Sequence, residues 1–313
     1  MIFITGDEAK SLAPMGEVIK ACHKVFIKHA QGKTVYPPKD QFMLPTSEWK
    51  WWGFMPVYAE GMGVACKVVC DYPENKKRGL PTIIATINLA DVDTGNVIAI
   101  IEATQLTAIR TGALCALAAD ALSRKDAETV GIIGCGVQAR TQLEGLAQVR
   151  KIKKTVISDL NEERMDAFIS DMSFLGILIS KGTPKDAASC DILVTATGAS
   201  TPVIKSEWIK PGTHITSIGA HTPDTSEIGS DLVTSSIVVI DTPDCFKSGD
   251  LKTCKVGDIT EIQEVLSGKA PGRKSESDVT IFKSVGTALQ DLAIARLVYD
   301  KAKEEGIGKE IDF

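Results

Sequence analysis

The chain has 313 residues, of which 44% are hydrophobic and 24% charged, and its formal net charge is −5. This length is near the size at which one hydrophobic core stops growing, so we expect two domains. The mildly acidic balance argues against a nucleic-acid-binding surface, which would need a basic face. No apolar stretch approaches the roughly 18 residues of a membrane span. The N-terminus also lacks a signal-peptide pattern, so we expect a cytoplasmic protein with no membrane partner.

The first hundred residues change from a helical pattern to a strand pattern. The run Thr5-Gly-Asp-Glu is typical of a capped helix start, and apolar residues recur with a helical period from Met15 to Gln31. Beyond residue 41, short apolar runs alternate with turn residues, and 91–96 reads as a hairpin connection. This pattern predicts strands at 42–44, 51–55, 63–70, 82–89 and 97–101.

A small-residue helix at 104–122 leads into a second region in which strands and helices alternate. Such alternation predicts an α/β domain with a parallel, doubly wound sheet. A final helix at 286–304 is expected to return to the first domain. The predicted strands are 129–133, 154–159, 176–179, 191–197, 214–218 and 237–241, and the predicted helices are 137–149, 161–174 and 184–189.

The turn after the first of these strands carries a dinucleotide-binding fingerprint. Residues 134–139, GCGVQA, have the form G-x-G-x-x-A between a predicted strand and a predicted helix. Gly134 suits a tight turn, Gly136 lets the backbone approach a pyrophosphate, and Ala139 lets the helix pack close. The helix N-terminus offers N–H groups to the phosphates, and Asp159 ends the next strand, where an acceptor for ribose hydroxyls is expected. An ordinary glycine turn is the alternative.

Lys67 and Arg110 are charged residues in apolar surroundings. Lys67 lies within a predicted strand and Arg110 within the small-residue helix, where a charge is costly unless it is paired or faces a cleft. Two such cations suggest a carboxylate-binding pocket, because Arg offers a planar fork and Lys a tunable point charge. The alternative is a pair of surface cations with buried stems. His221 follows another strand end, where ligands bind in open α/β sheets, and is either catalytic or structural.

The eight cysteines lie without paired CxxC spacing, and the four histidines do not cluster. Scattered cysteines of this kind are typical of reduced thiols in a cytosolic protein. We therefore expect neither a metal site nor a disulfide.

Taken together, these segments resemble the ornithine cyclodeaminase/mu-crystallin family. The match runs nearly end to end, and the segments LTAIRTGA at 106–113 and FKSVG at 282–286 are specific. The matching segments are Lys67 with 73–75, 79–81, 89–91, 94–95, 106–113, 133–138, 194–197, 211–214, 219–220 with Pro223 and Glu227, 282–286 and 290–293.

The resemblance implies a Rossmann domain at 121–295 and an α+β substrate-binding and dimerisation domain at 1–120 and 296–313, hence a homodimer. It also implies a bound NAD(P)(H). Asp159 favours NAD(H), because an acid there repels a 2′-phosphate, while Asn161 and Arg164 keep NADP(H) open. The expected cofactor-binding residues are Thr111, Gly134, Gly136, Val137, Gln138, Asp159, Thr195, Ala196, Thr197, Ile218, Gly219, Ser284, Val285 and Gly286.

The resemblance also assigns roles on the substrate side. Lys67 and Arg110 match the family's substrate-carboxylate residues, and Lys39 and Met55 are expected as further substrate contacts. The expected catalytic set is Lys67, Arg110 and His221. Lys67 is the natural proton-transfer group, because a neighbouring cation should lower its pKa. His221 is the second candidate for proton transfer.

Two departures from the cyclodeaminases argue against ornithine as the substrate. Those enzymes place an Asp where this chain has His221, and a Glu before their Met-Pro, where this chain has Gly53-Phe-Met-Pro56. A diamine needs anionic partners for its second ammonium group.

We therefore expect an NAD(P)-dependent oxidoreductase that transfers hydride between nicotinamide and C2 of a small imino or amino acid. Candidate reactions are 1-pyrroline-2-carboxylate to proline, and pyruvate plus ammonia to alanine. Ornithine cyclodeaminase, with NAD as a catalytic cofactor, stays open as an alternative. A non-enzymatic, NADP-dependent small-ligand binder of the mu-crystallin kind is the other.

Overall fold

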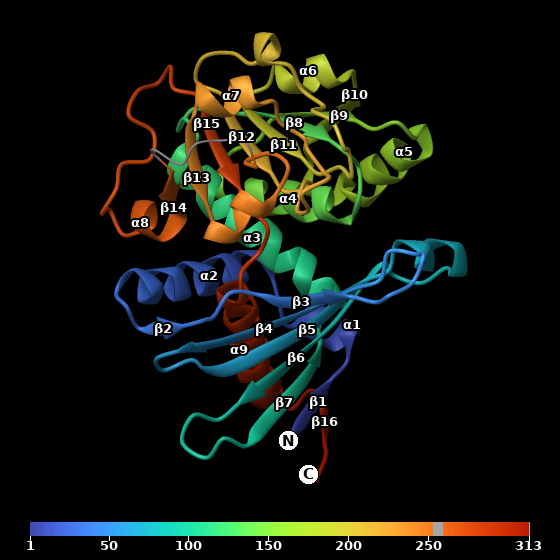
Figure 1. Ribbon diagram of the computed structural model, residues 1–313, viewed down its shortest axis with the longest axis vertical. Coiled ribbons are helices and arrows are strands. Elements are labelled where there is room, and N and C mark those ends of the chain that lie inside the picture. The colour runs from blue at the N-terminus through green and yellow to red at the C-terminus, as the bar shows by residue number, and fades with distance from the viewer. Residues whose placement is uncertain (253–258, 313) are drawn as a thin grey trace. The chain divides into compact units, whose positions relative to one another are not determined.

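The computed structural model describes residues 1–252 and 259–312 and divides into two compact units (Figure 1). Unit 1 is Met1–Arg110 with Thr287–Phe313, and unit 2 is Thr111–Gly286. Both junctions come earlier in the chain than the predicted boundaries at 120/121 and 295/296. The first junction falls inside the helix α3 (Thr104–Leu122) rather than in the polar segment that follows it. A boundary inside a continuous helix leaves no composition shift for the sequence to reveal.

Unit 1 is built on one mixed sheet, with strand order β16-β1-β7-β6-β5-β4-β2 and with β3 beside β4. Strands β4 to β7 form an antiparallel meander, and β1 runs parallel to β7. All five predicted strands are present. The strands β1, β2 and β16 were not predicted, because strands of two or three residues are too short to show an alternating pattern. The strands are β1 Ile2–Ile4, β2 Thr34–Val35, β3 Asp40–Met43, β4 Trp51–Ala59, β5 Gly63–Asp71, β6 Ile83–Ala90, β7 Val97–Glu102 and β16 Lys309–Glu310.

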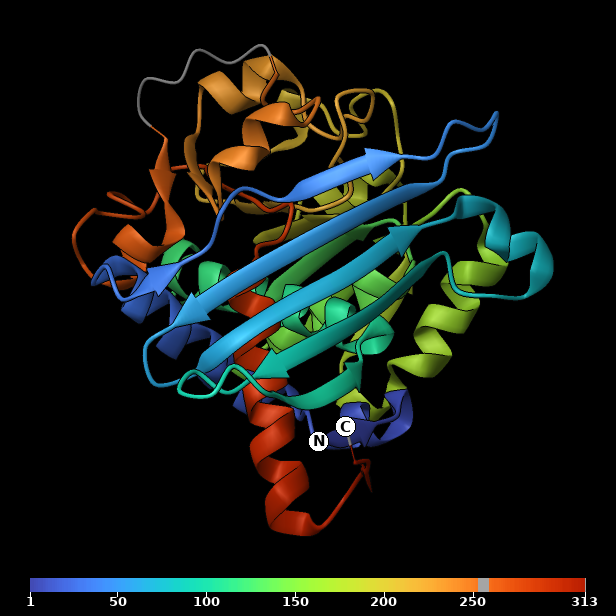
Figure 2. The same ribbon diagram turned by 60° about the horizontal axis from the view of Figure 1, so that its bottom comes forward.

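Helices cover one face of this sheet. The helix α9 (Ala288–Glu305) lies against β4, β5 and β6 and packs on α2 (Met15–Ala30), and α1 (Gly6–Ser11) lies against β7. Figure 2 looks onto the sheet, with α9 crossing behind its strands. Side chains alternate between the two faces of a strand. In β5, therefore, Ala65, Lys67 and Val69 are buried on the helix-covered face, and the alternating residues Val64, Cys66 and Val68 are more exposed.

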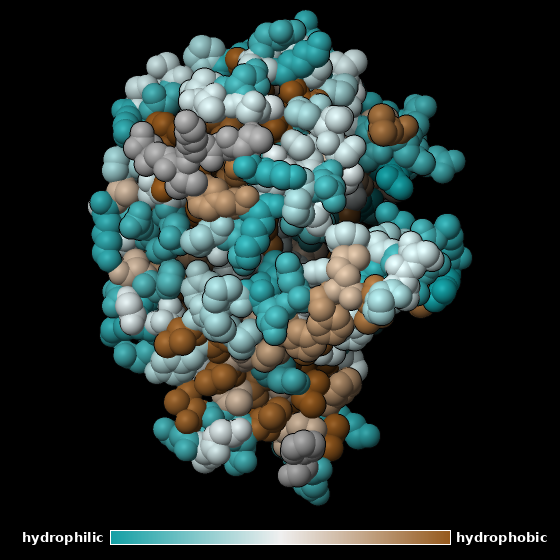
Figure 3. All heavy atoms as spheres, viewed as in Figure 1, coloured by the Kyte–Doolittle hydropathy of each residue, from teal (hydrophilic) through white to brown (hydrophobic). Residues whose placement is uncertain are grey.

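The other face of the sheet is mostly apolar and is partly exposed. We call it the outer face. In Figure 3 apolar residues gather over the lower part of the view, where Figure 1 draws these strands. Partly exposed apolar groups spread over several strands of one face are typical of an interaction surface. The outer face comprises Phe54, Pro56, Tyr58, Val64, Cys66, Val68, Ile84, Thr86, Asn88 and Ile100.

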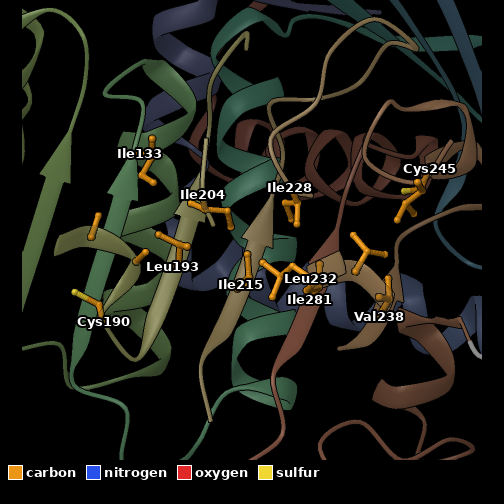
Figure 4. Close-up of a cluster of buried hydrophobic side chains, with 14 of the residues drawn as sticks. Ile133, Cys190, Leu193, Ile204, Ile215, Ile228, Leu232, Val238, Cys245 and Ile281 are labelled. Carbon is orange, nitrogen blue, oxygen red and sulfur yellow. The ribbon is translucent and has the colours of Figure 1, made fainter. Parts of the chain in front are cut away.

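Unit 2 is a doubly wound Rossmann-type domain, as the alternation of strands and helices predicted. All neighbouring strands run parallel, in the order β10-β9-β8-β11-β12-β15-β13-β14. Figure 4 shows apolar side chains on adjacent strands, including Ile133, Leu193, Ile215 and Ile281, packed in one core. The strands are β8 Thr129–Ile133, β9 Lys154–Ser158, β10 Leu178–Lys181, β11 Ile192–Thr195, β12 His214–Ser217, β13 Ile237–Ile240, β14 Thr260–Glu261 and β15 Thr280–Lys283.

The helices of unit 2 largely follow the predicted ones, with two local corrections. The predicted helix at 161–174 ends at Asp171, and a short 3₁₀ helix covers Ser173–Leu175. The strand predicted at 176–179 begins only at Leu178, because Gly176 closes the turn with a positive φ of 66°. The helices besides α3 are α4 Val137–Val149, α5 Glu162–Asp171, α6 Pro184–Ala188, α7 Ser230–Thr234 and α8 Ile262–Leu266. No helix in the described ranges is long and apolar enough to span a membrane.

Candidate active site

Lys67 lies in the middle of β5 on the helix-covered face. In the sheet it faces Met55 of β4 on one side and Ile87 of β6 on the other, and all three side chains are buried. Its Nζ donates a hydrogen bond of 2.8 Å to Oδ1 of Asp291, which lies in the first turns of α9. Both side chains are only 1% exposed, so the sheet and helix together bury a complete ion pair.

Arg110 joins the same cluster from α3. Its Nη1 donates a hydrogen bond of 2.6 Å to Oε1 of Gln290, and its Nε lies 3.1 Å from Oδ1 of Asp291. Gln290 in turn accepts the backbone N–H of Thr287 at 2.9 Å, which begins α9 with a capping box. The helix start that holds Asp291 in place therefore also orients the guanidinium group.

The Lys67–Asp291–Arg110 cluster can form further hydrogen bonds. Among the described residues, neither Oδ2 of Asp291 nor Nε of Arg110 has a hydrogen-bond partner, although both atoms are buried. Buried polar atoms without partners are rare in folded proteins and call for an explanation, such as a ligand or a bound water. Two cations and one carboxylate also leave one positive charge uncompensated within the cluster. An anion with hydrogen-bonding groups would complement both features.

The protonation of Lys67 is tuned by this environment. Burial of the ammonium group and the nearby Arg110 cation lower the pKa of Lys67 to about 7, against the opposing effect of Asp291. Lys39 contributes a small further lowering. A lysine with a pKa near neutrality can both give and take a proton under ordinary conditions.

The two other predicted substrate contacts differ in their placement. Met55 lies directly opposite Lys67 and is buried beside it. Lys39 immediately precedes β3, and its Nζ lies 5.9 Å from the centroid of the Trp51 ring. Lys39 therefore acts on the cluster through its charge, and a direct substrate contact by Lys39 stays a prediction.

In unit 2, the predicted cofactor residues follow the carboxyl ends of neighbouring parallel strands, apart from Thr111, which is buried in α3. Backbone hydrogen bonds continue the strand ladder into these loops, from Gly134 N–H to Ser158 O at 2.8 Å and from Ala196 N–H to Ile133 O at 2.9 Å. Ligands bind at this edge of open α/β sheets. These residues are Gly134, Gly136, Asp159, Ala196, Thr197, Ile218, Gly219, Ser284, Val285 and Gly286, with Val137 and Gln138 at the start of α4 and Thr195 at the end of β11.

The glycine-rich loop fits a dinucleotide phosphate. Gly136 has an ordinary φ of −81°, and a Cβ added there would meet no atom within 4 Å, so the protein's own packing does not require glycine. Gly136 is also the N-cap of α4, and no side chain caps this helix. The first N–H groups of the helix are therefore available to an anion, as at other phosphate sites. Gly134, with a φ of +93°, serves the turn itself.

Asp159 is fixed beside this loop. Its Oδ2 accepts the N–H of Cys135 at 2.8 Å, and its Oδ1 accepts the N–H of Asn161 at 2.9 Å. Nη1 of Arg164 lies 4.0 Å from Oδ1 of Asp159, so a cation stands next to the acid that the sequence singled out. An acid in this place favours NAD(H), and the adjacent cation is why NADP(H) was kept open.

Several residues that were predicted to bind the cofactor form side-chain hydrogen bonds to other residues of the protein. The hydroxyl groups of Thr195 and Thr197 donate to Glu227, and the hydroxyl group of Ser284 donates to Asp241 at 2.6 Å. Asp241 also accepts the N–H of Gly286. These residues hold their loops in place, and their hydroxyl oxygens can still accept hydrogen bonds.

His221 lies in the loop that follows β12 and is exposed. Its Nδ1 is 2.9 Å from the carbonyl oxygen of Gly219. His221 belongs to unit 2, whereas Lys67 and Arg110 belong to unit 1.

Three residues of these clusters received no role from the sequence: Gln290, Asp291 and Glu227. A signal was present for Asp291 and Gln290, because both occupy a buried stretch of α9 among Leu289, Leu292 and Ala293. A charge in an apolar helix is the feature that identified Arg110 in the sequence. Glu227 is fully buried in a loop, where no periodic pattern could reveal it.

Comparisons with known proteins identify the family of the chain. The sequence model of the ornithine cyclodeaminase/mu-crystallin family matches residues 2–306. Alanine dehydrogenase of Archaeoglobus fulgidus is 35% identical over 320 residues, covering 100% of this chain and 98% of that protein.

Two solved structures share the fold over nearly their whole length. The structure of Thermococcus litoralis Δ1-pyrroline-2-carboxylate reductase in complex with NADH and L-proline has a TM-score of 0.95 and 38% identity, covering 99% of this chain and 100% of that one. An archaeal alanine dehydrogenase dimer with bound NAD has a TM-score of 0.95 and 34% identity, covering 100% and 99%. The chain therefore belongs to the ornithine cyclodeaminase/mu-crystallin family.

Proposed function

We propose that the protein is an NAD(H)-dependent oxidoreductase that interconverts a small imino acid and the corresponding amino acid. The observation that carries the proposal is the buried Lys67–Asp291–Arg110 cluster, which has one uncompensated positive charge and a lysine whose pKa is lowered to about 7. The relatives named above support this reaction class, because they are an alanine dehydrogenase and a reductase bound to NADH and L-proline. NADP(H) stays an alternative cofactor because of Arg164.

The charge of the cluster selects the substrate class. One carboxylate balances the excess positive charge, and the planar guanidinium group of Arg110 offers paired donors to it. An ammonium group has three donors, and Asp291 accepts one of those of Lys67. The remaining donors can face the substrate carboxylate and nitrogen. Arg110 and Lys67 thus fix the orientation of C2, and orientation supplies much of the rate in such reactions.

Lys67 is the proton-transfer group. Bound nicotinamide supplies the hydride to C2 or accepts it. In the direction of reduction, Lys67 passes a proton to the substrate nitrogen as the C=N bond becomes a single bond. In the direction of oxidation it takes this proton back. A pKa of about 7 suits both directions near neutral pH.

The same charges disfavour a diamine substrate. Asp291 is an acid in the substrate cluster, but its Oδ1 already faces two cations. A second ammonium group would therefore meet an excess of positive charge rather than an anionic partner. His221, in place of an Asp, adds no negative charge.

We also propose that the protein is a homodimer that pairs through the outer face of the unit 1 sheet. The outer face is partly exposed and mostly apolar, which is costly for a monomer in water. A similar structure, the archaeal alanine dehydrogenase, is a dimer.

The proposal is tested by following NADH absorbance with 1-pyrroline-2-carboxylate, and separately with pyruvate and ammonia. Lys67→Met should lower kcat by about 100-fold or more, the usual size of a general acid–base contribution. Lys33→Met is the matched control, because Lys33 is exposed and pairs only with Glu60 among the described residues. We expect this control to keep full activity.

Two further measurements separate the alternatives. Proline and ammonia released from ornithine with catalytic NAD would favour the cyclodeaminase and overturn the proposal. Tight cofactor binding without turnover of any of these substrates would favour a ligand-binding protein of the mu-crystallin kind. Rapid reduction with no ornithine turnover supports the oxidoreductase.

A further inference from the structure

Gly219 and Ala220 precede His221, and all of their backbone N–H and carbonyl groups form hydrogen bonds. The N–H groups of Gly219 and Ala220 donate to Oε2 of Glu227, at 2.7 and 3.3 Å. The carbonyl oxygen of Ala220 accepts Nζ of Lys283 at 2.5 Å, and that of Gly219 accepts Nδ1 of His221 at 2.9 Å. A loop that carries an exposed imidazole is thus anchored to two buried, charged side chains.

Glu227 joins this loop to the preceding one. Its Oε1 accepts the N–H and the hydroxyl group of Thr197, at 2.6 and 2.8 Å. Glu227 therefore connects the segments that follow β11 and β12. Both of its oxygens accept backbone N–H groups, which can only donate.

Lys283 and Asp250 complete the network. The ammonium group of Lys283 is fully buried and uses all three donors, on Asp250 at 2.8 Å, Ser217 at 3.2 Å and Ala220. Asp250 accepts the backbone N–H of Glu227 at 2.6 Å through its other oxygen. Burial alone would raise the pKa of Asp250, but Lys283 and the hydrogen bonds to Asp250 keep it below its usual value.

A buried network of charged side chains adds little net stability to a fold. Buried ion pairs often stabilise a protein no better than apolar residues of similar volume. The opposite ends of β12 and β15 are linked by a neutral pair, in which Nδ1 of His214 lies 2.9 Å from the hydroxyl group of Thr280. Burial lowers the pKa of His214 to about 3, so this pair carries no charge at neutral pH. The fully buried Lys283–Asp250 ion pair lies at the strand ends that carry the His221 loop.

The hydrogen bond to Gly219 also defines the state of the imidazole. A carbonyl oxygen can only accept, so Nδ1 of His221 must carry the hydrogen. In the neutral ring Nε2 is then the proton acceptor, and in the charged ring it is a donor.

We propose that Glu227, Lys283 and Asp250 are positioning residues for His221, which hold its imidazole in the Nδ1–H tautomer and present Nε2 as a second proton-transfer atom in addition to Lys67. The tautomer part stands on the geometry alone, whereas the proton-transfer part rests on the proposed oxidoreductase function. The FKSVG segment at 282–286, in which Lys283 received no role from the sequence, contributes Lys283 to this task.

The first test measures the tautomer by NMR on the protein labelled with ¹⁵N-histidine, with His221→Asn to assign the signal. We expect the Nδ1–H form in the wild type and a shift towards Nε2–H in Glu227→Gln and Lys283→Met. Ser217→Ala is a milder variant in case those two fold poorly. Thr280→Val is the matched control, since it removes the neutral bond at the far end of the same strands. An unchanged tautomer in the three network variants would overturn the proposal.

The second test is a double-mutant cycle on the reductase reaction. Glu227→Gln should lower kcat by about 100-fold, the cost of a small misplacement of a catalytic group. In the His221→Asn background the same change should have little further effect, because the residue it positions is gone. Additive losses would mean that Glu227 does not act through His221. A wild type without reductase activity would refute the proposed function, while the tautomer measurement would still stand.

Discussion

At the scale of single residues, Asp291 controls how firmly Lys67 holds its proton. It is the only one of the named influences on Lys67 that raises its pKa, while burial and Arg110 lower it. Asp291→Asn keeps the size of the side chain and removes the charge. The pKa of Lys67 should therefore fall below its wild-type value of about 7.

The lower pKa of Lys67 in Asp291→Asn should shift the pH profile of kcat/KM for imine reduction in a defined direction. Reduction needs protonated Lys67, so activity falls as the pH rises through the pKa of this lysine. In Asp291→Asn the falling limb should move to lower pH, and the loss of activity should be greater at about pH 8 than at about pH 6. Asp300→Asn is the control, because Asp300 lies on the same helix in an exposed pair with Arg296. A limb that stays in place would show that Lys67 is not the titrating group.

Sequence reasoning identified Lys67 and Arg110 but gave Asp291 no role. The two cations were visible because each interrupts an apolar run with a charge. Their common partner lies 224 residues beyond Lys67, and no local pattern connects positions so far apart. The sequence can therefore indicate a buried charge, whereas the group that neutralises it becomes evident only in the folded chain.

At the scale of elements, two glycines at the start of unit 2 serve different purposes. A Cβ at Gly136 would meet open space, whereas a Cβ at Gly131 in β8 would overlap the backbone carbonyl of Ala187 in α6. Gly131→Ala should therefore destabilise the protein by about 1–3 kcal/mol through overpacking. Gly136→Ala should leave stability unchanged and weaken NADH binding by at least about tenfold, because the new methyl group occupies the space for the pyrophosphate.

Chemical denaturation and titration of NADH fluorescence on both variants separate the two effects. Each variant serves as the control of the other, because both replace glycine by alanine within one strand–turn–helix segment. Normal NADH affinity in Gly136→Ala would contradict the assignment of this loop as the phosphate site.

The elements that the sequence predicted well are long or strongly periodic. Helices α2, α3 and α4 and strands β5 to β7 follow the expected ranges closely, whereas β4 extends four residues beyond the predicted 51–55. Strand β15 was not predicted, although it lies between β12 and β13 in the sheet. It has only four residues and ends in Lys283, so its short apolar run gave no strand signal. The burial of Lys283 depends on Asp250, a contact that the local sequence cannot show.

At the scale of the whole molecule, alternation of strands and helices was enough to predict a doubly wound domain, but it was not enough to predict the strand order. In the order β10-β9-β8-β11-β12, the chain crosses back past β9 and β8 before it forms β11. The placement of β13 beyond β15 does not follow from the order of the chain. The first domain was predicted as strands and helices without a topology, since antiparallel neighbours and the parallel pair β1–β7 leave the same alternation pattern.

The outer face of the unit 1 sheet makes the assembly testable. Ile84 of β6 is 41% exposed on this face and lies opposite Cys70 of β5. Ile84→Glu should convert the proposed dimer into a monomer, because a carboxylate buried in an apolar interface without a partner is strongly disfavoured. In a monomer the new charge would simply be solvated, so the fold should persist, and circular dichroism should be unchanged.

Light scattering coupled to size-exclusion chromatography measures the mass directly. Phe174→Glu is the matched control, because Phe174 is 68% exposed and belongs to unit 2. It should leave the mass of the wild type unchanged. The Lys67–Asp291–Arg110 cluster lies on the helix-covered face of the same sheet, and alternation along β5 separates it from the outer face. A monomeric Ile84→Glu variant should therefore keep the lowered pKa of Lys67. A variant of wild-type mass would show that the protein does not pair through this face.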